Sequence, residues 1–205
     1  MLLVLSILTI FAGAVVAPLF GRQGRPGWSL FIALPPLVAF ILLLTAWFGY
    51  AQPDGSLMVS WEWFPAFGVS LDFCLDGLSV TMGLLVTGIG VLVGIYAVGY
   101  MKGHPQFGRF SSFFLFFMGS MLGLVLADNL ILLFVFWEMT SISSYLLIGF
   151  NHEDENARKK ALQALLVTGG GAVAMLAGFI LIGIVSETYR ISELGVLAEV
   201  LRSSP

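Results

Sequence analysis

Charged side chains are scarce in this sequence: Asp, Glu, Lys and Arg make up 10% of its 205 residues, against about 25% in a typical soluble domain. Hydrophobic residues make up 59%, and the mean hydropathy is +0.99. These values exclude an ordinary soluble fold and indicate an integral membrane protein, with the lipid bilayer as its first partner. The formal net charge is −3, and no basic cluster favours binding to nucleic acid.

Cysteine and histidine are also rare. The single cysteine, Cys74, excludes an intrachain disulfide and a thiolate metal site. The two histidines, His104 and His152, lie in charged loop segments without the spacing of metal ligands, so we expect them to be solvated. No phosphate-binding loop and no pair of nucleophile and base is apparent, so we expect no enzyme, no cofactor and no metal.

Long apolar runs dominate instead. Six of them have the length of a membrane-spanning helix, and they lie at about 1–20, 28–50, 78–101, 110–127, 130–150 and 162–185. The first run has no Lys or Arg before it, so we interpret it as a retained helix and not as a signal peptide. The sequence therefore predicts an all-α integral membrane protein, with a six-helix membrane domain over 1–186 and a tail over 187–205.

Between the second and third spans the periodicity changes. Apolar residues occupy alternate positions on both sides of Pro65, as at Val59 and Trp61 before it and at Leu71 and Phe73 after it. A period of two on both sides of a turn predicts a short β-hairpin.

Prolines and glycines mark several spans. Pro35 and Pro36 predict a kink in the second span. Gly119 and Gly123 in the fourth favour close helix packing, and the glycine run 169–171 indicates a flexible or closely approached segment in the sixth. In the tail, apolar residues recur as on one face of a short amphipathic helix; they are Ile191, Leu194, Leu197 and Leu201.

Basic residues fall mostly in the loops on one side of the predicted membrane domain. Seven of the nine lie there: Arg22, Arg25, Lys102, Arg109, Arg158, Lys159 and Lys160. Because loops rich in Lys and Arg stay in the cytoplasm, we expect both termini and the hairpin to be extracytoplasmic.

The segment from 52 to 76 is acidic and has no basic residue. Its carboxylates are Asp54, Glu62, Asp72 and Asp76. They either concentrate cations near an entrance or merely reflect the exclusion of Lys and Arg from this side; we favour the second interpretation.

One carboxylate lies deep in the fifth span. Glu138 follows Leu130 by eight residues, about 12 Å along a helix, and so lies near the middle of a hydrocarbon layer about 30 Å thick. An ionisable group there costs at least about 2.5 kcal/mol and usually marks a path for protons or ions. Ser141 and Tyr145 follow on the same helix face, at i+3 and i+7. The alternative role for Glu138 is a neutral acid that holds the bundle together through a hydrogen bond between helices.

Four segments carry a family resemblance: LDGLS at 75–79, ADNLILLFVFWE at 127–138, SYLLIGF at 144–150 and KALQALLVTGGGAVAMLAGF at 160–179. With them the sequence resembles the large antiporter-like subunits that Mrp-type multisubunit Na⁺/H⁺ antiporters share with respiratory complex I, and it is most similar to the Mrp large subunit. The resemblance implies a subunit of a secondary transporter in the bacterial plasma membrane, with Na⁺ and H⁺ as substrates and other antiporter subunits as partners.

The resemblance also implies that Glu138 pairs with a lysine on a broken seventh helix. The sequence ends at Pro205, before such a helix, so we expect either a longer protein or a separate chain to supply it against the fifth and sixth spans. The alternative is a structural subunit that docks in a larger complex and carries no ions itself.

Overall fold

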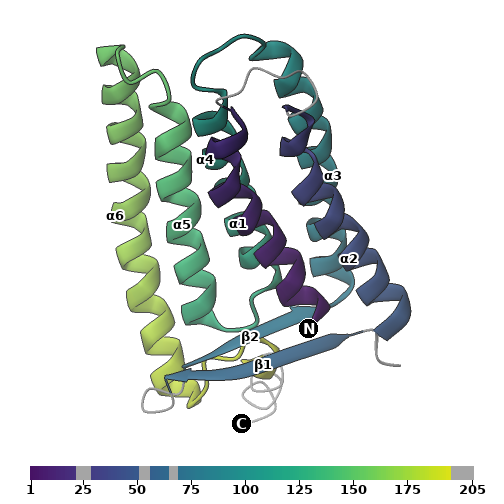
Figure 1. Ribbon diagram of the computed structural model, residues 1–205. Coiled ribbons are helices and arrows are strands. Elements are labelled where there is room, and N and C mark those ends of the chain that lie inside the picture. Colours follow the sequence, from purple (N-terminus) through teal and green to yellow (C-terminus); the bar gives the residue numbers. More distant parts are fainter. Residues whose placement is uncertain (22–28, 51–55, 65–68, 195–205) are drawn as a thin grey trace.

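The computed structural model describes residues 1–21, 29–50, 56–64 and 69–194. Within them the protein is mostly helical, with long helices side by side and a two-stranded hairpin across one end of the bundle (Figure 1). Six of the described helical segments have the length and apolar composition to cross a membrane, as predicted. The elements are α1 (Leu2–Gly21), η1 (Ser29–Ile32), α2 (Leu34–Tyr50), β1 (Leu57–Phe64), β2 (Val69–Leu75), α3 (Gly77–Tyr100), α4 (Phe107–Leu126), α5 (Leu130–Ile148) and α6 (Glu155–Ser186).

Helix α4 lies at the centre of the bundle, because α1, α3 and α5 all pack against it. The fully buried apolar side chains gather around α1, α2 and α4 and include Leu3, Ile10, Leu43, Leu115 and Leu122. Two glycines of α4 allow this close packing. A Cβ on Gly119 would lie 3.1 Å from the ring of Phe11 on α1, and a Cβ on Gly123 would lie 2.3 Å from the ring of Phe136 on α5. The prediction of close packing at these glycines is confirmed.

The paired prolines produce a break in the second span and not a kink within a helix. Residues Ser29–Ile32 form the short helix η1, and α2 begins at Leu34, so Pro35 and Pro36 lie in its first turn. Proline is tolerated there because the first amides of a helix have no partner within the helix. The prediction of a kink within one helix is therefore wrong: the second span is divided into η1 and α2.

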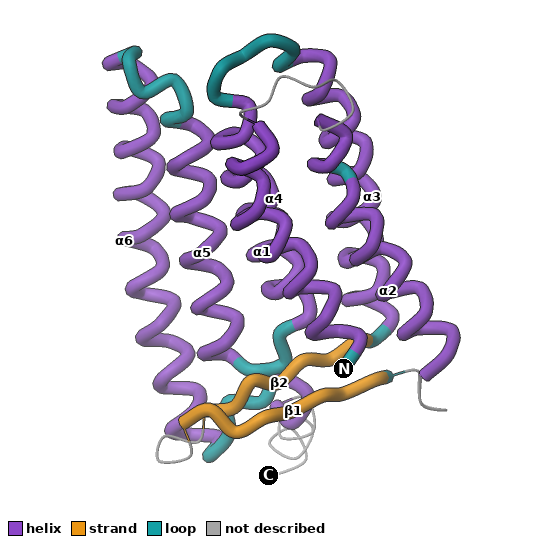
Figure 2. Tube along the Cα trace, viewed as in Figure 1, coloured by secondary structure: helices purple, strands orange, loops and turns teal. Residues whose placement is uncertain are grey.

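The hairpin prediction is confirmed. Strands β1 and β2 pair antiparallel, with Val59 opposite Phe73 and Trp61 opposite Leu71, and both cross one end of the bundle (Figure 2). The apolar face of β2 packs against the helices, with Val69, Phe73 and Leu75 buried. The predicted turn at Pro65 lies outside the described residues.

The two ends of the bundle differ. The start of α1, the hairpin, the 127–129 turn and residues 187–194 gather at one end, called here the hairpin end; the loops 101–106 and 149–154 lie at the opposite end (Figure 1). This division agrees with the predicted grouping of loops. Arg22, Arg25 and the tail beyond residue 194, where most of the predicted amphipathic helix falls, lie outside the described residues.

Helix α6 is the least covered span. Buried residues make up 6% of its apolar window, against 44% for α4. The helix begins at Glu155, because the Asp154 side chain caps the amide of Asn156, and it runs without interruption through the three glycines 169–171. A Cβ on any of these glycines would meet no other atom within 4 Å. Within the described residues the glycine run is therefore not closely approached by another segment, and its predicted flexibility stays a prediction.

Candidate functional site

Helix α5 positions Glu138, and its start is fixed by Asn129. The Asn129 side-chain oxygen accepts hydrogen bonds from the amides of Ile131 (3.0 Å) and Leu132 (3.3 Å), which an α-helix would otherwise leave unpaired at its first turn. Glu138 follows this cap by nine residues, about 13 Å along the helix axis. It therefore lies near the middle of the span, as predicted from the sequence.

The faces of α5 indicate which neighbour Glu138 adjoins. Phe136 packs against Gly123 of α4. Glu138 lies two residues further along, about 200° around the helix, and so on the face turned away from α4. Gly149, eleven residues or about three turns beyond Glu138, lies over nearly the same face, and a Cβ there would come 3.3 Å from the Cβ of Ala161 on α6. Glu138 therefore lies on the side of α5 where α6 packs.

The Glu138 carboxylate is half-buried, and its Oε1 atom is shielded from solvent without any hydrogen-bond partner among the described residues. A buried polar atom without a partner costs free energy, and buried polar groups in proteins are nearly always paired. Among the described residues, Oε1 of Glu138 thus lacks the hydrogen-bond partner that buried polar atoms usually have.

Ser141 and Tyr145, the other predicted site residues, lie on the same continuous helix and are half-buried. The Ser141 hydroxyl donates to the Trp137 carbonyl of its own helix (3.3 Å), as does the neighbouring Thr140 hydroxyl (2.6 Å). No side chain in the described ranges hydrogen-bonds the Glu138 carboxylate at Oε1. The structure thus places the predicted residues on one helix but does not join them in a hydrogen-bonded network.

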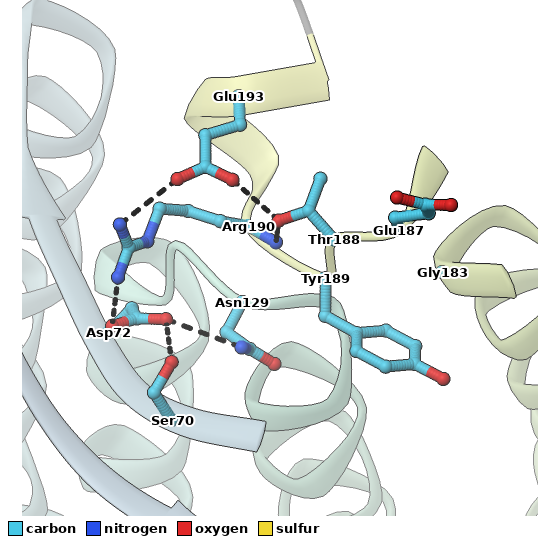
Figure 3. A pocket seen from close by; sticks show the side chains of 9 residues that line it. All are labelled: Ser70, Asp72, Asn129, Gly183, Glu187, Thr188, Tyr189, Arg190 and Glu193. Carbon is cyan, nitrogen blue, oxygen red and sulfur yellow. Dashed lines mark hydrogen bonds and ion pairs between the residues drawn. The ribbon is translucent and has the colours of Figure 1, made fainter. Parts of the chain in front are cut away.

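A second polar group, not anticipated from the sequence, occupies the hairpin end. It joins Asp72 of β2, Asn129 before α5 and Arg190 after α6, and we call these three residues the clasp (Figure 3). Asp72 is 3% exposed. Its carboxylate accepts hydrogen bonds from the hydroxyls of Ser60 and Ser70, from Asn129 Nδ2 at 3.3 Å and from Arg190 Nη2 at 3.2 Å.

These partners determine the charge of the clasp. Burial disfavours the ionised form of Asp72, but the hydrogen bonds from Ser60, Ser70, Arg190 and Asn129 outweigh burial, so its pKa is lowered from the usual value. The hydrogen bond to Asp72 raises the pKa of Arg190 against the effect of burial. The clasp therefore contains an ion pair at neutral pH.

Backbone hydrogen bonds strengthen the same junction. The Asp128 amide donates to the Asp72 carbonyl (2.8 Å), the Leu130 amide to the Tyr189 carbonyl (2.9 Å) and the Ile191 amide to the Asp128 carbonyl (2.9 Å). The Asp128 carboxylate also accepts from the amide and the hydroxyl of Ser192, at 2.9 and 2.7 Å. The strand β2, the start of α5 and the segment after α6 are therefore held together, beside a polar pocket of about 370 Å³ (Figure 3).

Sequence reasoning missed the clasp for a physical reason. Asp72 occupies a polar position of an alternating strand, which predicts a solvated side chain, but the segment after α6 covers that face of the strand. One signal was present: Arg190 is one of only two basic residues outside the basic loops. Asp76 is also structural, since its carboxylate caps α3 by accepting from the Ser79 amide at 2.7 Å. Two of the four carboxylates in the acidic segment thus have structural partners.

At the opposite end, Arg109 organises the loop between α5 and α6. Its guanidinium donates to the Phe150 carbonyl, lies 4.9 Å from the centre of the Phe150 ring and approaches Nδ1 of His152 at 3.3 Å. His152 is exposed, as predicted for a solvated side chain. The prediction did not include its contact with Arg109.

Two family comparisons cover most of the chain. Residues 61–111 match the family described as NADH-ubiquinone oxidoreductase (complex I), chain 5 N-terminus, and residues 127–205 match the family described as NADH:quinone oxidoreductase/Mrp antiporter, TM. Among curated proteins, the chain is 39% identical over 195 residues to the A1 subunit of a Na⁺/H⁺ antiporter from Staphylococcus haemolyticus, covering 94% of this chain and 24% of the relative. It is 41% identical over 204 residues to the A/B subunit of a probable K⁺/H⁺ antiporter from Rhizobium meliloti, covering 100% of this chain and 20% of the relative.

Solved structures agree with these sequences. A chain of the Mrp complex from Dietzia sp. superposes with a TM-score of 0.82 at 32% identity, covering 94% of this chain and 20% of that one. A chain of respiratory complex I from Thermus thermophilus has a TM-score of 0.75 at 24% identity, covering 95% and 38%, and shows the shared fold alone. The chain thus spans about a quarter or less of the length of these curated relatives.

Proposed function

Because this chain belongs to the family of antiporter-like membrane subunits that Mrp antiporters share with respiratory complex I, and is similar to the amino-terminal portion of the Mrp large subunit, we propose that it is part of a multisubunit cation/proton antiporter. In this proposal Glu138 is the protonatable relay of the path. The unpartnered Oε1 of Glu138 in the middle of α5 carries the proposal.

The relay needs a balancing charge from outside the described residues. An isolated carboxylate in a low-dielectric site protonates and no longer carries charge, because burying the ion alone costs several kcal/mol or more. We propose a lysine on a broken helix as the partner, placed against α5 and α6. The uncovered surface of α6 supports this position. Ser141 and Tyr145, on the same face of α5, are proposed to line the path on one side of Glu138.

The substrates proposed are a monovalent cation and protons. The relatives are named as Na⁺/H⁺ and K⁺/H⁺ antiporter subunits, and Na⁺ is the cation we propose first. A second role is favoured by one observation, the sparse cover of α6: the chain would then dock and seal a larger complex without carrying ions.

We expect the chain to act only within its complex. In everted vesicles that contain the complete antiporter, deletion of this chain should reduce Na⁺-dependent proton flux, followed by a pH-sensitive dye, to the background level, and re-expression should restore it. The purified chain alone in liposomes should show no such flux. Flux through the chain alone, lost on Glu138→Gln, would contradict the need for a partner.

We further propose a bacterial plasma membrane location with the hairpin end extracytoplasmic, from the distribution of Lys and Arg. In a Cys74→Ser background, Met58→Cys on β1 is expected to react with an impermeant maleimide in intact cells. Glu153→Cys, in the loop at the opposite end, should not react in intact cells and should react in inside-out membrane vesicles. Both side chains are exposed, so access to either is decided by the side of the membrane. The reverse labelling pattern would overturn the orientation.

A further inference from the structure

The buried positions of α6 are held by very small residues: Ala161 lies beside Gly149, which follows α5, and Gly183 lies beside the ring of Tyr189. These positions are Ala161, Ala172 and Gly183, each eleven residues or about three turns from the next, and therefore on one face of the helix. Small residues bring two backbones close, but they do not interlock as large side chains do. At these three positions, therefore, packing fixes the distance of α6 from its neighbours more firmly than its alignment.

Side-chain interactions at the two ends of α6 supply the alignment. At one end the Arg158 guanidinium donates to the His152 carbonyl. At the hairpin end Arg190 joins Asp72 at 3.2 Å and Glu193 at 3.1 Å. The Asp72 contact is the more buried of the two, since the Arg190 side chain is 37% exposed, that of Asp72 4% and that of Glu193 49%. A partly buried pair is screened by salt less than a fully exposed pair is.

Asn129 connects this ion pair to the helix of Glu138. Its side-chain oxygen caps α5, while its side-chain nitrogen donates to Asp72 at 3.3 Å. One amide group therefore couples the position of Asp72, and through it of Arg190, to the first turn of α5. The same junction fixes the α6 end, because the Leu130 amide bonds to the carbonyl of Tyr189.

We propose that Arg190 is a positioning residue for Glu138: its ion pair with Asp72 holds α6 against the face of α5 that carries Glu138 and so keeps the carboxylate covered. The inference rests on the proposed function for its biological meaning, but its geometry does not depend on transport. Loss of the ion pair would weaken the hold on the hairpin end of α6, where the backbone hydrogen bonds at Tyr189 and Ile191 remain, and access to Glu138 would increase through more frequent local opening without unfolding of the α1–α4 core.

The reactivity of Glu138 with dicyclohexylcarbodiimide, an apolar reagent for protonated carboxyl groups in membranes, tests this proposal. The complete antiporter in native membranes is labelled over a range of pH, and the adduct at Glu138 is quantified by mass spectrometry, with Glu138→Gln as the blank. Arg190→Ala and Asp72→Asn should increase the labelling rate by about fivefold or more, as expected for local opening. Arg190→Lys, which keeps the charge, should restore most of the protection.

Matched variants separate positioning from general loosening. Glu193→Gln removes the exposed partner of Arg190 and should leave the rate unchanged. Ser112→Ala removes a hydrogen bond between α4 and α1, to the Ala14 carbonyl at 2.6 Å, and should also leave it unchanged. An equal increase in Ser112→Ala, or no increase in Arg190→Ala and Asp72→Asn, would overturn the proposal.

A milder variant covers the case in which the buried pair is needed for folding. Ser60→Ala removes one hydroxyl that donates to Asp72 and accepts from Arg190 at 3.4 Å, on an exposed residue. It should increase labelling by about twofold, a smaller opening of the same kind. An unchanged rate in Ser60→Ala, when the two stronger variants do not accumulate, also counts against the proposal. If Glu138→Gln retains transport, the proposed relay role of Glu138 is wrong. The labelling experiment still tests whether Arg190 holds α6 against α5.

Discussion

Replacement of Glu138 by Gln is expected to reduce Na⁺-dependent proton flux of the complete antiporter to the level of vesicles without this chain. The amide has nearly the same shape as the carboxylic acid but does not bind or release a proton in the physiological range. Because Oε1 has no partner among the described residues, the substitution breaks no hydrogen bond at that atom within them. Assembly, measured by co-purification of the other subunits, should therefore be retained.

Glu153→Gln is the matched control for this experiment. It removes a carboxylate from the exposed loop between α5 and α6, and flux should remain at the wild-type level. Wild-type flux in Glu138→Gln would instead favour the structural docking role. Loss of assembly in Glu138→Gln would indicate an acid that holds subunits or helices together by hydrogen bonding.

The largest effect on stability is expected for Gly123→Val. A Cβ at this position would lie 2.3 Å from Cε1 and 2.5 Å from Cδ1 and Cζ of Phe136, far inside van der Waals contact. Phe136 is 8% exposed and belongs to the buried cluster, so its ring has little room to move. Overpacking of this kind typically costs about 1–3 kcal/mol and here separates α4 from α5. Denaturant titration of the purified chain, followed by circular dichroism, should show a lower free energy of unfolding for Gly123→Val than for the wild type.

Gly178→Val provides the comparison, because a Cβ on Gly178 in the middle of α6 meets nothing within 4 Å. Both substitutions place valine inside a helix and so share the cost of helix propensity. The difference between their free energies of unfolding therefore measures the clash with Phe136. Phe136→Ala in the Gly123→Val background should recover part of the loss, since it removes the ring that the new side chain meets. An equal loss in Gly178→Val would show that the effect comes from the helix interior and not from the α4–α5 contact.

The sequence predicted the helices and the hairpin because both depend on local patterns. Apolar length identifies a span, and the alternation around Pro65 identifies paired strands, irrespective of what packs against them. The position of Glu138 followed from the same reasoning. Its neighbours did not, because the partner of a side chain in the middle of a helix is decided by packing between helices.

The clasp shows most directly which contacts cannot be predicted from local sequence patterns. Asp72, Asn129 and Arg190 are 57 and 61 residues apart in consecutive steps along the chain, and no periodicity connects them. Their meeting depends on where α6 ends relative to β2. The form of the break at Pro35 and Pro36 was missed for a related reason: a proline pair predicts a disrupted helix, but whether the chain bends or restarts there depends on the neighbouring helices.

The length of α6 has a consequence for the lipid around the protein. Its uncharged part, from Ala161 to Val185, extends about 37 Å, longer than a hydrocarbon layer of about 30 Å. A helix with such an excess tilts, or the bilayer thickens around it, at a cost of a fraction of a kcal/mol per Å. With few neighbours to resist tilting, α6 should respond to bilayer thickness more readily than the covered helix α4. Acyl-chain length is then a variable that acts on the helix beside Glu138, and thin and thick membranes should present that carboxylate differently.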